Sequence, residues 1–137
     1  MKLAAVFTWP VRVYYEDTDA AGVVYYANYL RFLERARTEW LRHLGFEVVA
    51  MERDYGSVFV VRRLAIDYRF PARLGDALCV SVAIAERGYS RLRLTQTVAR
   101  DDAQLCAADV TLACLDSTSW RPVAMPAAVA QKFEELA

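Results

Sequence analysis

The sequence has no excess of charge of either sign, because 17 Lys and Arg residues balance 17 Asp and Glu residues. No basic run stands out, so nothing in the sequence favours a nucleic-acid partner or an anionic membrane surface. No apolar stretch approaches the roughly 20 residues that span a bilayer. The apolar segment at residues 3–7 is too short for the core of a signal peptide. We therefore expect a cytoplasmic protein with a small-molecule partner and no membrane insertion.

Cysteine and histidine are both scarce. Cys79, Cys106 and Cys114 form no CxxC pair, and the only histidine is His43. The spacing of a zinc site is therefore absent, and so is a base partner for a catalytic thiol. We expect the three cysteines to be reduced, buried apolar side chains, and we expect neither a metal nor a cofactor.

Internal repeats and low-complexity linkers are also absent. A chain of 137 residues is the size of one domain with its own core, so we expect a single domain over residues 1–137. The hydrophobic fraction of 56% is high for so short a chain. Another subunit is expected to cover part of that apolar surface, which predicts a homo-oligomer.

The longest regular pattern is an amphipathic segment from about Asn28 to Leu44. Apolar residues recur at steps of three and four, while charged residues occupy the other side. At roughly 1.5 Å per residue, the segment predicts a helix about 27 Å long with one face on a core. Asn28 is expected to cap its start, and Gly45 stands where a helix usually stops.

Most of the remaining chain alternates with the period of half-buried strands. Pro10 marks the start of the first of these, and the segments between them are rich in turn-forming residues. A last short helix is expected at residues 127–136, whereas residues 1–7 resemble an apolar leader and residues 46–56 an irregular stretch. The expected strands are at residues 11–15, 57–70, 77–87, 90–100 and 104–115.

In the second strand, even positions such as Val58 and Leu64 are predicted to face the helix. The apolar start of the opposite face, Phe59 and Val61, lines a ligand pocket, a subunit contact or a plain structural surface. One long helix followed by antiparallel strands predicts an α+β fold, in which a curved sheet wraps around a central helix.

An acidic loop at residues 16–22 precedes the helix. It places Asp17 and Asp19 close to the helix N-terminus, where free amides and the helix dipole favour negative charge. Such a site stabilises an oxyanion, and a nearby Asp acts as base or nucleophile. On spacing alone, the alternative is that both aspartates form turns and that Gly22 supplies a positive φ.

The run YEDTDAAGVVYYANY at residues 15–29, followed by FLERARTE at residues 32–39, resembles the signature of hotdog-fold acyl-CoA thioesterases. It is similar to the 4-hydroxybenzoyl-CoA thioesterase family and, within it, to the YbgC-like branch associated with the Tol-Pal cell-envelope system. The resemblance implies a hotdog fold and hydrolysis of thioesters of CoA, or of acyl-carrier protein, to the free acid. It also implies edge-to-edge dimers that often double to tetramers, with active sites at the dimer interface.

In that family the second Asp of the Asp-Thr-Asp segment is the catalytic carboxylate, which is Asp19 here, and the favoured oxyanion donor is the N–H of Tyr26. Many YbgC-like members carry His where this chain has Tyr26, a departure that leaves substrate preference open and the catalytic Asp unchanged. Phosphate contacts fall near Arg87 and Arg91, for which a solvated basic edge is the alternative. The expected substrate-binding residues are Gly22, Val24, Tyr25, Asn28, Val61, Arg87, Ser90 and Arg91.

The sequence leaves the role of Asp19 open between attack on the thioester and deprotonation of a water. Asp17 is expected to accept amide hydrogen bonds inside the loop. Preference among short-chain, medium-chain and aromatic acyl groups is open as well. A hotdog hydratase or dehydratase is an alternative, although His43 is badly placed for one. A non-catalytic, acyl-binding or envelope-associated adaptor is another, against which the complete Asp19 loop argues.

Overall fold

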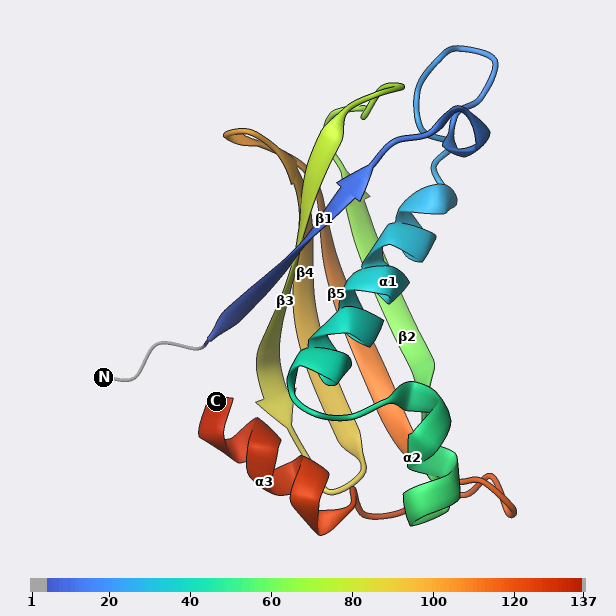
Figure 1. Cartoon of the computed structure of the whole chain (residues 1–137), viewed down its shortest axis with the longest axis vertical. Helices are drawn as coiled ribbons and strands as arrows, with labels where there is room; N and C mark the ends of the chain where they lie inside the picture. Colours follow the sequence, from blue (N-terminus) through green and yellow to red (C-terminus); the bar gives the residue numbers. More distant parts are fainter. Residues whose placement is uncertain (1–4, 137) are drawn as a thin grey trace.

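The computed structural model describes residues 5–136, which form one curved antiparallel sheet with helices on its concave side and at one end (Figure 1). The strands lie in the order β1-β3-β4-β5-β2. This arrangement confirms the predicted α+β hotdog architecture. The elements are β1 (Val6–Arg12), a 3-10 turn (Tyr15–Asp17), α1 (Asn28–His43), α2 (Val48–Tyr55), β2 (Ser57–Tyr68), β3 (Ala77–Arg87), β4 (Arg91–Arg100), β5 (Ala103–Asp116) and α3 (Ala127–Leu136).

Helix α1 packs on β1, β3 and β4, as its apolar pattern predicts. Phe32, Leu33 and Ala36 on its inner side have no exposed surface. They meet the inward side chains of β3 and β4, which alternate with outward polar or small residues. Burying a large apolar side chain contributes about 1.5–3 kcal/mol. This packing, more than the propensity of 16 residues, holds α1 in place.

A buried glutamine also ties α1 to the sheet. Gln96 on β4 is 1% exposed. Its Nε2 donates to the carbonyls of Leu33 on α1 (3.1 Å) and Ser81 on β3 (3.2 Å), and its Oε1 accepts from Arg37 (3.0 Å). Because these bonds satisfy the buried amide, they fix the position of α1 along β3 and β4.

The sequence places the first strand at residues 11–15, which is wrong. Strand β1 runs from Val6 to Arg12 and pairs with β3, from Val6 opposite Ala83 to Arg12 opposite Ala77. Pro10 lies inside this strand because β1 is at the edge of the sheet, where a missing N–H is tolerated. Of the expected leader, residues 1–4 lie outside the described residues, and Val6 is already part of the strand.

The stretch expected to be irregular contains α2. Two valines at its start are weak helix formers, which hides a helix of eight residues. Only Met51 of α2 is buried. Gly56 ends the helix with a left-handed φ of 67°, a conformation that glycine adopts without a steric penalty.

Strand β2 ends at Tyr68 rather than at Phe70, and its inward face changes along its length. A bulge interrupts its pairing with β5 between Val61 and Arg63. After the bulge, the even positions pack against the core as predicted. Before the bulge an odd position, Phe59, packs on the core instead, with its ring centroid 6.3 Å from that of Phe133. The extra residue of a bulge reverses the alternation, so the prediction of one continuous even face is wrong.

The remaining elements agree with the sequence to within one residue, including α3 and the two short hairpin loops between β3, β4 and β5. Cys106 and Cys114 are buried as predicted, and burial raises the pKa of Cys106 to about 12. Cys79 is instead exposed, because it lies on the outer face of β3. Within residues 5–136 no helix is both long and apolar enough to cross a membrane.

Candidate active site

Asp19 lies at the tip of a small turn that precedes α1. Its N–H donates to the Val23 carbonyl (2.9 Å), its carbonyl accepts from Gly22 N–H (3.0 Å), and its Oδ1 accepts from Ala21 N–H (2.8 Å). Gly22 has a φ of 78°, so the turn requires the conformational freedom that the sequence predicts. Asp19 is exposed, and its Oδ2 has no partner among residues 5–136. One oxygen therefore shapes the turn, and the other is available for chemistry.

Asp17 builds the frame behind this turn. It is 4% exposed, and its Oδ2 accepts from Tyr14 N–H (2.9 Å), which confirms the expected structural role. Its carbonyl accepts from Tyr25 N–H (3.0 Å) and from Asn28 Nδ2 (2.9 Å). The Asp17 carboxylate thus holds the chain before the loop, and its carbonyl connects the loop to the start of α1.

Asn28 does not cap α1 in the predicted way. The residue before the helix is Ala27, which makes no side-chain capping bond, and the Asn28 amide donates backwards to Asp17. The N–H groups of Tyr26 and Ala27, just before the helix, find no acceptor in the described part of the chain. Free amides at a helix N-terminus form a site for negative charge, and here they follow the Asp19 turn directly.

Aromatic rings surround these amides. The ring centroid of Tyr26 lies 4.9 Å from that of Tyr25 and 6.2 Å from that of Tyr68. The ring centroid of the buried Tyr29 lies 5.5 Å from that of Tyr68. A side-chain hydrogen bond with Tyr26 raises the pKa of Tyr25. The Tyr68 hydroxyl donates to the Tyr26 carbonyl (3.0 Å). Tyr68 appears in the sequence only as one more apolar strand position, so its hydroxyl contact was not predictable from the pattern.

The loop between β2 and β3 supports the site from one side. Val24 N–H donates to the Ala72 carbonyl (2.8 Å), and Ala72 N–H donates to the Tyr29 hydroxyl (2.9 Å). Asp76 closes this loop, because its Oδ2 accepts from Arg73 N–H (2.8 Å) and from Arg100 Nη1 (2.6 Å). Val24 is buried, so it serves this support rather than the exposed surface.

Asp76 should make the stability of the protein depend on acid. Burial opposes its ionisation, but the Arg73 N–H and the Arg100 guanidinium outweigh burial, and the pKa of Asp76 is lowered. The stabilisation is therefore present above the pKa of Asp76 in the unfolded chain, which is about 4. It is lost as pH falls through the lower pKa of Asp76 in the folded protein. We expect Asp76→Asn to reduce Tm at pH 7 and to flatten its decline below about pH 4.

Thermal unfolding of both proteins at a series of pH values checks this expectation. Asp67→Asn is the matched control, because its ion pair with Arg69 is longer, at 3.4 Å, and more exposed. If Tm fell equally steeply with decreasing pH in the wild type and in Asp76→Asn, the role assigned to Asp76 would be contradicted.

The predicted phosphate contacts lie at the other end of the sheet. Arg87, Arg91, Arg63 and Arg93 surround a depression of about 330 Å³ beside the β3–β4 hairpin. Arg93 is held by Glu86 (3.1 Å) and Asp109 (2.9 Å), whereas Arg87 and Arg91 make no ion pair within residues 5–136. Ser90 contributes its carbonyl to Cys114 N–H (2.7 Å). Strand β3 begins beside the Asp19 loop and has 11 residues, so about 35 Å separates its two ends.

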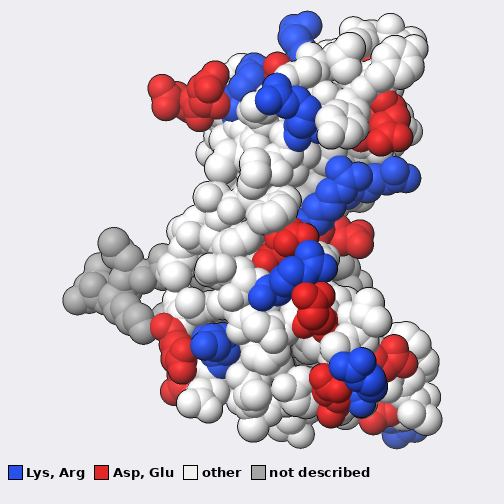
Figure 2. Space-filling view, viewed as in Figure 1, with Lys and Arg blue, Asp and Glu red and all other residues white. Residues whose placement is uncertain are grey.

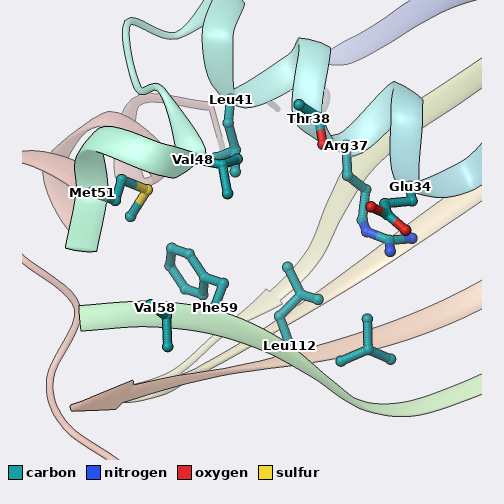
Figure 3. Close-up of a pocket in the computed structure, with 10 residues that line it drawn as sticks. Glu34, Arg37, Thr38, Leu41, Val48, Met51, Val58, Phe59 and Leu112 are labelled. Carbon is teal, nitrogen blue, oxygen red and sulfur yellow. The ribbon is translucent and has the colours of Figure 1, made fainter. Parts of the chain in front are cut away.

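Val61 lies apart from Asp19 as well, in an apolar groove of about 220 Å³ between α1, α2 and β2 (Figure 3). The groove has an apolar part at α2 and a polar end, where Glu34 and Arg37 lie side by side. Its other lining residues are Thr38, Leu41, Val48, Met51, Val58, Phe59 and Leu112. Within one chain, the structure thus brings together Asp19, Gly22, Tyr25, Tyr26 and Asn28, but not Val61 or the hairpin residues.

Acidic and basic side chains alternate over the face that carries α1, without a large patch of one sign (Figure 2). In residues 5–136 no group of three or more His, Cys, Asp or Glu side chains is arranged to hold a metal. The arrangement offers the unpaired Asp19 carboxylate oxygen, which can act as a base or nucleophile, and unpaired amides, which can stabilise an oxyanion.

Known proteins resemble this chain over nearly its whole length. Residues 13–133 match the Thioesterase-like superfamily. The acyl-CoA thioesterase YbgC of Haemophilus influenzae is 45% identical over 130 residues, which are 95% of this chain and 96% of that protein. The acyl-CoA thioester hydrolase YbgC of Escherichia coli O6:H1 is 43% identical over 131 residues, with 95% and 97% covered.

A solved structure agrees in fold. The 1,4-dihydroxy-2-naphthoyl-CoA thioesterase of Synechocystis superposes with a TM-score of 0.88 and 23% identity, covering 96% of this chain and 98% of that one. At 23% identity, this comparison supports a shared fold and nothing further.

Proposed function

Because this chain belongs to the thioesterase-like superfamily, we propose that it hydrolyses acyl-CoA thioesters at the N-terminal end of α1, with Asp19 as the reacting carboxylate. One observation supports this assignment above the others. The Asp19 Oδ2 is exposed and unpaired, and the turn that carries it leads directly to the unpaired N–H groups of Tyr26 and Ala27. A carboxylate and an oxyanion site are the two groups that acyl transfer requires.

In the proposed reaction the thioester carbonyl oxygen accepts from Tyr26 N–H, with Ala27 N–H beside it. Negative charge that develops on this oxygen is stabilised by the amides and by the positive end of the α1 dipole. Asp19 then either attacks the carbonyl carbon, forming an anhydride that water opens, or takes a proton from the attacking water. Both routes break the C–S bond, and CoA leaves as a thiolate that is protonated to the thiol.

Tyr68 is proposed as a positioning residue for this oxyanion site. Its hydroxyl donates to the Tyr26 carbonyl, which shares one peptide plane with Ala27 N–H. The bond fixes the orientation of that plane, and it polarises the N–H on the opposite side. Tyr68 lies on β2, so the strand that ends beside the site also aligns the Ala27 N–H.

Tyr68→Phe should lower kcat about fivefold and leave KM nearly unchanged, because it removes one hydrogen bond worth about 1 kcal/mol while the ring stays. Steady-state thiol release measures both constants. Tyr55→Phe is the control, since the Tyr55 hydroxyl, at the end of α2, makes no hydrogen bond within residues 5–136. A Tyr68→Phe enzyme with wild-type kcat would remove the positioning role.

The proposed active unit is a dimer formed along β2. Strand β2 is the last strand of the sheet, so its outer edge is free to pair. Asp19 and the arginines of the β3–β4 hairpin are at opposite ends of one chain, too far apart to bind the same CoA. Antiparallel pairing of β2 with a second copy would bring the partner's hairpin and groove to the Asp19 end, where Arg87 and Arg91 suit phosphate.

Release of free thiol from a panel of acyl-CoAs tests the proposed activity. The groove beside Val61 is mainly apolar, and apolar pockets discriminate by about 1–3 kcal/mol per methylene at most. We expect several short-chain, medium-chain and aromatic acyl-CoAs to be hydrolysed within about thirtyfold of one another in kcat/KM. Thioesters of acyl-carrier protein belong in the same panel.

No thiol release from any of these thioesters would overturn the proposed activity and favour an adaptor. Hydration of an enoyl-CoA without thiol release would favour a hydratase. A preference above about a thousandfold for one acyl group would show that a polar contact selects it, and Tyr26 would be the first residue to mutate.

A further inference from the structure

Arg37 is a charged residue whose surroundings within the chain do not neutralise it. Its side chain lies partly buried between α1 and the sheet, and this burial lowers its pKa. One of its five N–H groups donates to Gln96 Oε1 (3.0 Å), but no ion pair within residues 5–136 includes it. Removing a guanidinium from water is costly unless a carboxylate or comparable acceptor pairs with it.

Glu34 lies one turn earlier on the same side of α1. The two side chains are neighbours at the polar end of the groove (Figure 3). The charge of Glu34 acts on Arg37, but Glu34 makes no hydrogen bond or ion pair within the described residues. It is exposed. The chain thus presents one carboxylate and one guanidinium, side by side, on a surface that opens towards β2.

Leu30 lies one turn before Glu34 on the same side of α1. Leu30, Glu34 and Arg37 are spaced by four and three residues, which is the spacing of a helix-pairing seam. Leu41, the next residue at this spacing, is 6% exposed and belongs to the core of the same chain. An antiparallel copy of α1 centred between residues 35 and 36 would place Glu34 opposite Arg37.

The rest of the fold leaves room for such a copy. Helix α1 packs on β1, β3 and β4, and the inner side of β2 is covered less, with Val61 47% exposed. The free edge of β2 lies on the same flank of the molecule. A two-fold axis that pairs the β2 edges would also bring the seam of one α1 towards that of the other.

We propose that Glu34 and Arg37 form two reciprocal ion pairs with the partner's Arg37 and the partner's Glu34 across a two-fold axis between residues 35 and 36. The inference rests on the β2-edge dimer proposed above, and it specifies what orients the two chains. In an isologous contact each residue meets its complement twice. A parallel or shifted arrangement of the helices would place like charges or a charge and a leucine together, so the pairs select one register.

Two charge reversals, Glu34→Arg and Arg37→Glu, test the proposal. Each variant alone would place like charges at both contacts, so we expect its dimer dissociation constant to rise at least about a hundredfold. When the two variants are purified separately and mixed, every contact in the mixed dimer again joins opposite charges. The expected result is a heterodimer of one tagged and one untagged variant, detected by co-purification and by light scattering.

The mixing result separates a contact between chains from one within a chain, because both variants lack the intrachain Glu34–Arg37 combination. Arg35→Glu is the matched control: it reverses a charge on α1 outside the seam and should leave assembly unchanged. Circular dichroism verifies folding. If Arg37→Glu unfolds because it loses its bond to Gln96, the exposed Glu34→Gln provides the test, with an expected rise of about tenfold in the dissociation constant.

A wild-type mass of 15.5 kDa at micromolar concentration would overturn the proposed assembly and the inference with it. A wild-type dimer whose single reversals assemble equally well, or whose mixed reversals do not form a heterodimer, would overturn the ion pairs alone. A Glu34→Gln dimer with the wild-type dissociation constant would do so too. Thioesterase activity is not part of the readout, so the outcome is independent of the proposed reaction.

Discussion

Replacing Asp19 with Asn should lower kcat by about 10²- to 10⁴-fold, the range that one positioned base contributes. The Asn side chain keeps an oxygen that accepts from Ala21 N–H, so the turn is preserved. It removes the negative oxygen that either attacks the thioester or deprotonates water. Thiol release under single-turnover conditions measures the chemical step, while an unchanged Tm and an unchanged mass show that folding and assembly persist.

Asp17→Asn is the control for that experiment, because it makes the same chemical change two residues earlier. Asp17 is buried, and its carboxylate accepts from Tyr14 N–H inside the loop. Its loss should lower Tm, with any loss of activity following the loss of folded protein. An Asp19→Asn enzyme with normal turnover, or an Asp17→Asn enzyme that is folded but inert, would contradict the assignment of the two roles.

Phe133→Ala should destabilise the protein by about 3–5 kcal/mol, the usual cost of deleting a buried Phe. Phe133 has no exposed surface, and its ring stacks on Trp40 with centroids 5.3 Å apart and planes 4° apart. Val129 is the other buried residue of α3. Because so few contacts hold this helix, we expect part of the loss to appear as detachment of α3 from the sheet.

Urea unfolding gives the change in free energy, and the fluorescence of Trp40, measured with Trp9 and Trp120 replaced by Phe, reports whether its environment changes before global unfolding. Lys132→Ala, one residue earlier on the exposed side of α3, should change stability by less than about 0.5 kcal/mol. A similar effect of both substitutions would show that Phe133 does not anchor the helix.

The sequence predicted the parts of the fold in which one strong local pattern decides the structure. Helix α1 and strands β3, β4 and β5 have clear alternation and short turns, and their bounds differ from the prediction by one residue at most. Strand β1 was misplaced because its position depends on pairing with β3, far along the chain, and Pro10 obscured it. The bulge in β2 depends on its register with β5, which no local pattern records.

In the candidate site, too, the sequence predicted what is local and missed what depends on distant segments. Asp19, Gly22 and Tyr26 follow one another closely, so the sequence placed them together. The Tyr68 hydroxyl and the Ala72 carbonyl reach this loop from the β2 end and the β2–β3 loop, and only the folded chain shows that they do. The sequence assigned no position to Arg37, and its contact with Gln96 follows from how closely α1 approaches β4.

The frame behind Asp19 is built mainly from backbone atoms. The Asp17 carbonyl accepts both the Tyr25 N–H and the Asn28 amide, and Val24 N–H pairs with the Ala72 carbonyl. The position of the loop and of the first turn of α1 therefore depends little on the side chains at positions 25 and 26. Tyr26 stands where the family resemblance implies a His in many members, and the backbone bonds described here do not depend on which of the two side chains is present.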